Sequence, residues 1–305
     1  DVANKLYWLE LKRLNVDTYA DDVEYYEVYK DWKLIWYYIL DAFYNPNKSA
    51  GCRASIVRNK NIHWTWVRLP IALDILNFQK GKDVTLLSHG DVSNLFHEFG
   101  HAIHALAADS KYSQLNWFSV EWDFVEVPSQ FMENYTWWEW LKTFAKNYKT
   151  WEPMSDELIE KLDKLRKFLS WITVNTQILY SRIDMLFHTQ QVPDTIEWLD
   201  DEFFDIIDWA FYFKWDKSNK TYTAFSHLFN GGYAAGYYSY IRSQIIEFDI
   251  FSVFSKNWIF DKQTATDFYD KVLSQWSRKP AIQLFEDFMW TGNINLDWFY
   301  ENYWF

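Results

Sequence analysis

The chain has 305 residues, of which 49% are hydrophobic, and a formal net charge of −12. This hydrophobic fraction is ordinary for a globular protein, so we expect a folded chain rather than a disordered one. An acidic surface repels phosphate backbones and anionic lipid headgroups, so we expect neither nucleic acid nor a membrane surface as a partner. No apolar stretch approaches the roughly 20 residues that a membrane-spanning helix needs.

The N-terminus and the cysteine content bear on the compartment. Residues 1–5 contain no basic region followed by an apolar run, so we expect no secretory signal. The first residue is Asp1 rather than methionine, which leaves room for a start upstream. The single cysteine, Cys52, excludes an internal disulfide and fits a reducing compartment, so we expect a cytoplasmic protein. We interpret Cys52 as a buried structural thiol rather than as a nucleophile.

The first 85 residues favour β-structure. Aromatic and β-branched residues over 24–45, on both sides of a polar stretch at 30–33, predict a hairpin. The segment 67–79 is consistent with another strand, and residues 81–83 follow it as a loop.

From Ser88 onward the hydrophobic pattern changes to the period of amphipathic helices. The predicted helices are 91–108, 126–147, 155–190, 199–213, 232–254, 264–275 and 280–288. No repeat, low-complexity tract or flexible linker interrupts the series. We therefore expect one domain over 1–305, mostly α, with a small β element in 1–85 and a helical part in 86–305.

The first predicted helix carries the motif His-Glu-x-x-His at His97, Glu98 and His101. Residues four apart lie on one helix face, so both imidazoles can reach one metal ion, and Glu98 projects beside it. Catalytic zinc keeps three protein ligands and one open position for water. Histidines on an otherwise apolar helix would need partners, which favours a zinc site over two structural histidines.

The third zinc ligand can come from several positions. A metzincin would have a histidine six residues beyond His101, but that residue is Ala107. Glu126 is the better candidate, because 29 residues after His97 allow a helix, a turn and a second helix packed on the first. The alternative for Glu126 is a capping box with Asp123 as the N-cap. Glu133 is a rival ligand, or a residue that orients a zinc histidine.

Three segments of the chain resemble the family of thimet oligopeptidase, oligopeptidase A and dipeptidyl carboxypeptidase. They are 95–104, 122–134 and 225–240, and the resemblance extends from about residue 25 to the C-terminus. It implies a zincin-like helical catalytic lobe, short peptides as substrates, and one Zn²⁺ ion with Glu126 as its third ligand. The run Gly-Gly-Tyr-Ala-Ala-Gly-Tyr-Tyr at 231–238 is most similar to the dipeptidyl carboxypeptidase branch.

The third of these segments is rich in tyrosine. Tyr233, Tyr237 and Tyr240 have the spacing of one helix face, with Tyr238 on another, and by itself this stripe is typical of an aromatic core. The resemblance instead implies substrate and transition-state binding, because the family uses a histidine and tyrosines here. These roles are carried to His227, Tyr237 and Tyr240, and with less support to Tyr233. The glycines Gly231 and Gly232 would let backbone and substrate approach closely.

The chain departs from the family in two ways. Family members are roughly twice as long, with an N-terminal helical region that forms the other wall of a substrate channel, so we expect that a missing N-terminal half is a partner. The chain also has 20 Trp and only 8 Gly. The resemblance predicts glycine at Trp32, Trp36, Trp117, Trp151, Trp171, Trp258, Trp276, Trp290 and Trp304.

Several of these tryptophans lie in predicted turns, where positive φ favours glycine. Our hypothesis is that UGA codons, which some bacterial lineages read as glycine, are written here as tryptophan. Genuine substitution or design is the alternative.

The sequence therefore predicts a zinc-dependent peptidase. Glu98 would activate the water, and Tyr240, with Tyr237 or His227, would stabilise the oxyanion. The rival hypothesis is a truncated remnant that binds peptides or a partner chain without cleaving them. The intact Glu98 favours the enzyme, because a pure binder has no need for that carboxylate.

Overall fold

A computed structural model describes residues 1–109, 111–113, 119–137, 139–168, 170–189, 195–210, 216–218, 220–229 and 231–303. The N-terminal part is a five-stranded sheet with the strand order β1-β2-β3-β7-β4. Its strands are β1 (Glu10–Arg13), β2 (Val23–Lys30), β3 (Lys33–Phe43), β4 (Arg53–Arg58) and β7 (Ile71–Phe78). Within this sheet β3 and β7 pair in parallel, and the other neighbouring strands pair antiparallel. The strand order makes β7 an interior strand and β4 an edge strand.

The predicted hairpin is confirmed. β2 and β3 pair antiparallel through a two-residue turn, Asp31-Trp32, in which φ is 49° and 65°. The predicted strand 67–79 is wrong at its start, because its first residues form β6 (Val67–Arg68), which pairs with β5 (Asn61–Ile62) in a separate small ribbon. Pro70 interrupts the run, since proline cannot donate a ladder hydrogen bond.

Helices make up most of the remaining chain, which confirms a mostly α fold with a small β element. They are α1 (Val2–Tyr7), α2 (His89–Ala107), α3 (Trp122–Val125), α4 (Val127–Glu133), α5 (Asp156–Lys167), α6 (Ser170–Thr189), α7 (Ile196–Ala210), α8 (Ser226–Phe229), α9 (Ser239–Asn257), α10 (Lys262–Phe268), α11 (Ala281–Met289) and α12 (Asp297–Tyr303). Two short 3-10 segments, Asn134–Thr136 and Glu139–Thr143, follow α4.

Three predicted helices have the wrong bounds. The helix 126–147 ends at Glu133, and 155–190 divides into α5 and α6. The helix 232–254 begins only at Ser239, because Gly232 and Ala235 have φ of 83° and 53°, which a right-handed helix does not allow.

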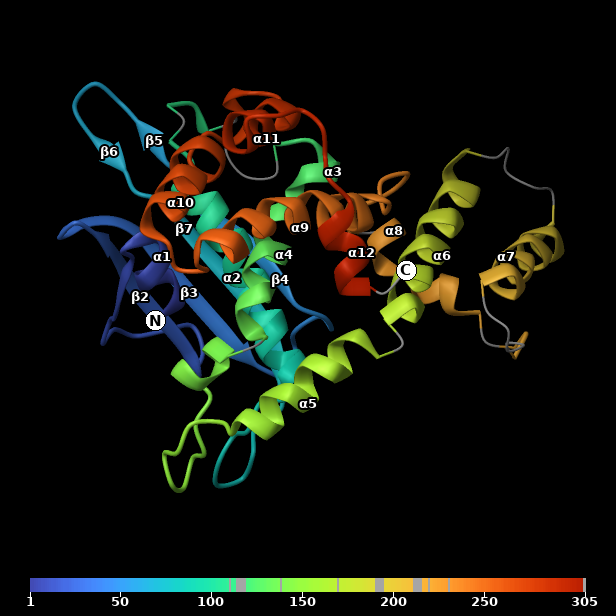
Figure 1. The fold of residues 1–305 in the computed structure, drawn as a ribbon, viewed down its shortest axis with the longest axis horizontal. Helices are drawn as coiled ribbons and strands as arrows, with labels where there is room; N and C mark the ends of the chain where they lie inside the picture. The colour runs from blue at the N-terminus through green and yellow to red at the C-terminus, as the bar shows by residue number, and fades with distance from the viewer. Residues whose placement is uncertain are drawn as a thin grey trace.

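The main core lies between the sheet and the central helices. α2 packs on β7 and β4, α4 packs on α2, and α9 packs on α4. In Figure 1, α2 and α4 cross the middle of the molecule, with β2 and β3 to their left. The alternating burial of β7 supplies one wall of this core, since every second side chain from Ala72 to Phe78 is buried.

A second, smaller hydrophobic cluster lies at the other end of the molecule. It joins α6 and α7 with residues from 222 to 240, and its largest buried side chains include Phe203, Phe204 and Tyr222. Figure 1 shows α6 and α7 projecting from the end that is farthest from the sheet. None of the helices in the described ranges is long and apolar enough to cross a membrane.

Candidate active site

Helix α2 carries the His-Glu-x-x-His motif and begins at a well-formed cap. The Ser88 hydroxyl accepts a hydrogen bond from the Asp91 backbone N–H, and the Asp91 carboxylate accepts one from the Ser88 backbone N–H. This reciprocal capping box satisfies two backbone donors and fixes where the helix starts. The start in turn fixes the face on which His97 and His101 lie, one turn apart.

Close packing of α4 against α2 depends on Gly100. A Cβ atom at this position would lie 2.5 Å from the Pro128 carbonyl oxygen and 2.7 Å from the Ser129 Cα. Any larger residue would push α4 away, and with it Glu126 at the start of that helix. The glycine between Phe99 and His101 therefore sets the distance between the two halves of the candidate metal site.

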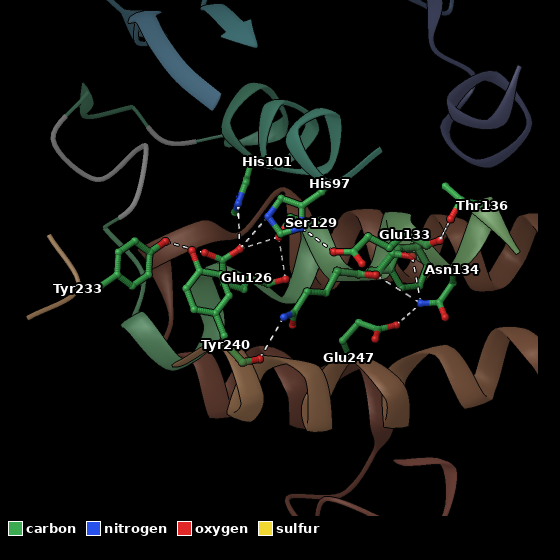
Figure 2. A network of polar contacts seen from close by, with 12 residues as sticks. His97, His101, Glu126, Ser129, Glu133, Asn134, Thr136, Tyr233, Tyr240 and Glu247 are labelled. Carbon is green, nitrogen blue, oxygen red and sulfur yellow. Dashed lines mark hydrogen bonds and ion pairs between the residues drawn. The ribbon is translucent and has the colours of Figure 1, made fainter. Parts of the chain in front are cut away.

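The structure brings His97, His101 and Glu126 together. The Nε2 atoms of His97 and His101 lie 3.2 Å and 3.0 Å from the same Glu126 oxygen, Oε2. Figure 2 shows both imidazoles pointing from α2 toward this carboxylate. One ligand atom from each residue lies within 4.8 Å of the others, so the group could hold a metal ion. Two imidazoles and one carboxylate are a donor set that suits zinc.

The surroundings of Glu126 contradict the capping-box alternative. Its side chain makes no cap hydrogen bond to α3 or α4, and Asp123 pairs instead with Arg242. The carboxylate is fully buried and accepts hydrogen bonds from the Ser129 hydroxyl and from the Tyr233 phenol. Its lone pairs are thus directed at the histidines rather than at a helix end.

Glu133 contacts the far side of His97 rather than the ligand group. The His97 Nδ1 lies 2.6 Å from Glu133 Oε1, and since a carboxylate only accepts, Nδ1 carries the proton. When His97 loses its second proton to a metal ion, the lone pair is therefore on Nε2, the nitrogen that faces Glu126. This geometry matches the orienting role considered for Glu133.

The histidines and Glu126 stabilise one another electrostatically. Burial alone would lower the pKa of His97, but hydrogen bonds and charge from Glu126 and Glu133 hold it well above its usual range. Burial alone would raise the pKa of Glu126, but His101 and His97 hold it well below its usual range. Without a cation the site therefore keeps a positive charge on the His97 imidazole, next to the place where a metal ion would supply positive charge.

Glu98 lies one residue beyond His97 and is 6% exposed. Burial is the largest cause that raises the pKa of its carboxyl, and the negative charge of Glu126 adds to this, while the two motif histidines oppose it. A glutamate with a raised pKa is the type that accepts and returns a proton near neutral pH. Glu98 is thus suited to general-base chemistry.

Four aromatic side chains gather near Glu126: His227, Tyr233, Tyr237 and Tyr240. The ring of His227 lies 5.7 Å, 5.9 Å and 6.0 Å from the rings of Tyr233, Tyr237 and Tyr240. Burial is the main cause that raises the pKa of all three phenols and lowers that of His227. The phenols therefore keep their protons, and the imidazole is neutral, so each can donate a hydrogen bond.

The tyrosines gather for a different reason from the predicted one. Residues 231–238 form turns, and of the three tyrosines only Tyr240 lies on α9, so they do not share a helix face. Tyr238 is 43% exposed and lies apart, as predicted. A Cβ at Gly231 would lie 2.9 Å from the His227 Cα, and Gly232 has positive φ, so both glycines serve the backbone of this turn.

The sequence pattern did not indicate one residue of this site, Asp184. Asp184 on α6 is fully buried, and its carboxylate accepts hydrogen bonds from the backbone N–H groups of Ala235 and Tyr237. His188, which we interpreted as structural, pairs with Asp184. The signal was the spacing of Asp184 and His188, four residues apart, but nothing in it indicates the distant loop.

Cys52 is a half-buried free thiol, and burial raises its pKa. A thiol with a raised pKa is a poor nucleophile, in agreement with the structural interpretation.

A His-Glu-x-x-His helix packed on a helix that begins with glutamate is typical of metal-dependent peptidases. The chain belongs to the family described as peptidase family M3, whose family model matches residues 1–293.

Relatives within the family are similar over most of this chain. It is 31% identical to oligopeptidase A of Haemophilus influenzae, over 91% of this chain and 42% of the relative. It is 27% identical to dipeptidyl carboxypeptidase of Escherichia coli, over 95% of this chain and 43% of the relative. Overall identity is thus higher to the oligopeptidase A chain, although the motif at 231–238 resembles the other branch.

The fold also matches a solved structure, PZ peptidase A with inhibitor 2. The TM-score is 0.58 at 16% sequence identity, over 86% of this chain and 42% of that one. The chain spans less than half the length of the relatives it matches.

Proposed function

We propose that this chain is the catalytic lobe of a zinc-dependent peptidase that hydrolyses short peptides. The observation that carries the proposal is the group of His97, His101 and Glu126, of which His101 and Glu126 are buried and whose ligand atoms lie within 4.8 Å of one another, with Glu98 adjacent on α2. Membership of peptidase family M3 supports the same conclusion. The 305 residues act as one domain in this proposal.

One Zn²⁺ ion would be held by His97 Nε2, His101 Nε2 and Glu126. When bound, the ion supplies a Lewis acid that polarises the scissile carbonyl and lowers the pKa of a water. Glu133 holds the His97 ring in the required tautomer through Nδ1. The Ser129 hydroxyl donates to Glu126 Oε2, the same carboxylate oxygen that faces the two histidines.

Glu98 is the general base and then the general acid. It takes a proton from the attacking water, and it later gives that proton to the amine that leaves when the peptide C–N bond breaks. Its raised pKa suits both steps, because the carboxylate has enough basicity to accept the proton at neutral pH.

Tyr240, together with Tyr237 or His227, donates hydrogen bonds to the oxygen that becomes negative at the scissile carbonyl. The raised pKa values of the tyrosines and the lowered pKa of His227 support this role, because all three groups are then neutral donors. Tyr233, Gly231 and Gly232 border the same space and are proposed to contact the substrate.

An extended peptide can be held by the edge of the sheet. In the described residues β4 pairs with β7 on one side, and its other edge is available to a further strand. The helix that bears Glu98 packs on β4, which would align such a peptide with the catalytic groups. We also propose that an N-terminal half supplies the other wall of the substrate channel, since the relatives are more than twice as long as this chain.

We propose the cytoplasm as the compartment, because the single cysteine, Cys52, fits a reducing environment.

The test is zinc content together with cleavage of an internally quenched peptide, by the chain alone and with an N-terminal half supplied in trans. We expect about one zinc per chain, with hydrolysis that a chelator abolishes and zinc restores. Zinc without hydrolysis in both settings would contradict the enzyme. It would favour the second candidate, a module that binds peptides without cleaving them. Cleavage products would distinguish an oligopeptidase from a peptidyl-dipeptidase.

A further inference from the structure

The loop from Gly231 to Tyr238 has little regular structure to hold it. It connects α8 to α9 and contains Gly232 and Ala235 at positive φ. A non-glycine residue such as Ala235 adopts this conformation rarely, and it persists only where the surroundings fix it. Since this loop carries Tyr233 and Tyr237 and leads into Tyr240, whatever fixes it also places the tyrosines.

Asp184 contacts the loop at this unusual conformation. Its Oδ1 accepts from the Ala235 N–H and its Oδ2 from the Tyr237 N–H, both at 2.8 Å. The side chain is fully buried, where hydrogen bonds to a charged group are strong. His188, one turn along α6, places its Nδ1 2.9 Å from the Asp184 backbone carbonyl and 2.8 Å from Oδ1, so it contacts the carboxylate as well as the backbone of Asp184.

The opposite side of the loop is attached to the candidate metal site. The Tyr233 hydroxyl donates to Glu126 Oε1 at 2.6 Å, and Figure 2 shows this ring directed at the carboxylate. Two buried carboxylates, Glu126 and Asp184, therefore hold the same loop from two sides. One belongs to the proposed metal site and the other to the cluster of α6 and α7.

We propose that Asp184 is a positioning residue, which fixes the loop so that Tyr237 and Tyr240 face the scissile carbonyl. The kinetic consequence rests on the proposed function, whereas the effect on the loop does not. In this proposal Asp184 neither transfers a proton nor binds the substrate. It acts through the backbone, since displacement of a catalytic group by about 1 Å can lower the rate by roughly 10²-fold.

Asp184→Asn is the first test, because the amide keeps the shape and places an N–H₂ donor against one backbone N–H. We expect hydrogen–deuterium exchange at the Ala235 and Tyr237 amides to accelerate by about tenfold or more, with exchange in the middle of α9 unchanged. In the active protein kcat should fall by roughly 10–100-fold with KM nearly constant. Asp205→Asn, an exposed change on α7, is the matched control and should alter neither.

Unchanged exchange at the Ala235 and Tyr237 amides would overturn the proposal. Equal acceleration at every amide would also overturn it, because it would show that Asp184 stabilises the whole fold rather than this loop. If Asp184→Asn does not fold, the same exchange measurement on His188→Ala tests the proposal. Acceleration confined to the Ala235 and Tyr237 amides would support the proposal, and no acceleration there would overturn it. A chain without hydrolytic activity would contradict the proposed function, while the exchange measurement would still test Asp184.

A second inference concerns tryptophan at positive φ. Seven non-glycine residues in the described ranges have positive φ, and five of them are Trp: Trp8, Trp32, Trp151, Trp258 and Trp290. Tryptophan is not a residue that favours this region, which glycine adopts freely. Trp8 was not among the positions at which the family resemblance predicts glycine, so the backbone supports the hypothesis independently.

The local structures at these positions are ones that glycine normally completes. Trp8 and Trp290 follow α1 and α11 in the left-handed conformation, where a helix commonly ends in glycine. Trp258 ends α9 with φ 121° and ψ 125°, and Asp31-Trp32 closes a hairpin of the type for which Asp-Gly is preferred. Trp32 and Trp290 are also 89% and 84% exposed, so their rings contribute little packing.

Other tryptophans lack this signature. Trp36 is buried in β3 and Trp171 lies within α6, both without positive φ, and Trp276 lies in a short 3-10 segment, also without it. Trp117 and Trp304 lie outside the described residues. We infer that glycine occupies positions 8, 32, 151, 258 and 290 in the protein as its native cells make it.

Peptide mass spectrometry of the protein from its native cells tests this inference, and we expect glycine at all five positions. In a protein that has tryptophan at these positions, Trp32→Gly and Trp290→Gly should each raise Tm by roughly 2–4 °C, because glycine adopts the left-handed backbone conformation without strain. Trp64→Gly is the control, because Trp64 is 94% exposed and has no positive φ, and it should give no gain. Tryptophan in the native peptides would overturn the inference.

Discussion

The two parts of the candidate site are built in different ways. The proposed metal ligands lie on α2 and at the start of α4, two helices of the main core. The proposed oxyanion donors come from α8, the Gly231–Tyr238 loop and the first turn of α9, beside the smaller cluster of α6 and α7. The first part is held by helix geometry and close packing at Gly100, the second by hydrogen bonds to a buried carboxylate.

This difference predicts which property a substitution should alter in each part of the site. A helix fixes the relative positions of residues four apart without further support. A loop with positive φ at Gly232 and Ala235 has no such internal rule and depends on distant partners. Changes at the helical part should therefore act on metal binding or on proton transfer, and changes at the loop should act on kcat through position.

The largest effect is expected from Glu126→Ala, which removes a proposed ligand and leaves the imidazoles of His97 and His101 without their shared carboxylate. The protein should lose its zinc, and with it all hydrolysis. Glu133→Ala should weaken zinc binding only by roughly 10–100-fold, because Glu133 acts through His97. Zinc content measured by atomic spectroscopy separates the two. Retention of zinc in Glu126→Ala and its loss in Glu133→Ala would reverse the assignment.

Glu98→Gln should leave zinc bound and lower kcat by roughly 10²–10⁴-fold, because the amide keeps the shape and loses the base. Steady-state cleavage of a quenched peptide by the zinc-loaded variant measures this. Glu160→Gln, the same change at an exposed position on α5, should have no effect. Activity in zinc-loaded Glu98→Gln comparable to that of the unaltered protein would remove Glu98 from the mechanism.

Tyr240→Phe tests the loop side of the comparison. Loss of one hydroxyl that donates to the oxyanion should lower kcat by roughly 10²–10³-fold, with little change in KM because the bond strengthens in the transition state. Tyr238→Phe is the control, since Tyr238 is exposed and faces away. Equal behaviour of the two variants, or a Tyr240→Phe protein that mainly loses stability, would assign the ring to the core.

The smallest effect is a pH dependence of zinc affinity. The pKa of His97 is raised well above 6.5 in the metal-free site, so zinc must displace a proton from it. Apparent affinity should therefore rise about tenfold per pH unit between about pH 6 and pH 8.

The same raised pKa stabilises the metal-free fold in full below about pH 6.5, the ordinary value for histidine, and this contribution disappears as pH rises through the raised pKa. Competition titrations with a chelator at several pH values measure the affinity, and an affinity independent of pH would show that His97 is neutral without metal. Glu133→Gln removes one of the carboxylates that raise the pKa of His97 and keeps all three proposed ligands, so it should weaken the dependence.

The helical half of the site could be predicted from sequence because its information is local. The spacing of His97 and His101 determines that they share a face once Ser88 and Asp91 start the helix. Glu126 was placed by spacing and by family resemblance, yet only packing excluded the capping box, because both readings use the same carboxylate. The hairpin could be predicted for a similar reason, since its turn lies between two short, strongly patterned strands.

The loop could not be derived in this way. The spacing of Tyr233, Tyr237 and Tyr240 suggested a helix, but the chain forms turns. The rings converge because Glu126 holds the Tyr233 hydroxyl and Asp184 holds the loop backbone, from segments far apart in sequence. The edge strand β4 and the divided helices α5 and α6 also escaped prediction. The amino-acid sequence by itself determined the helical metal-binding motif and most element types, since these follow from local periodicity and caps. Only the tertiary structure decided which distant carboxylate fixes which loop, because hydrogen bonds between distant segments leave no periodic signal.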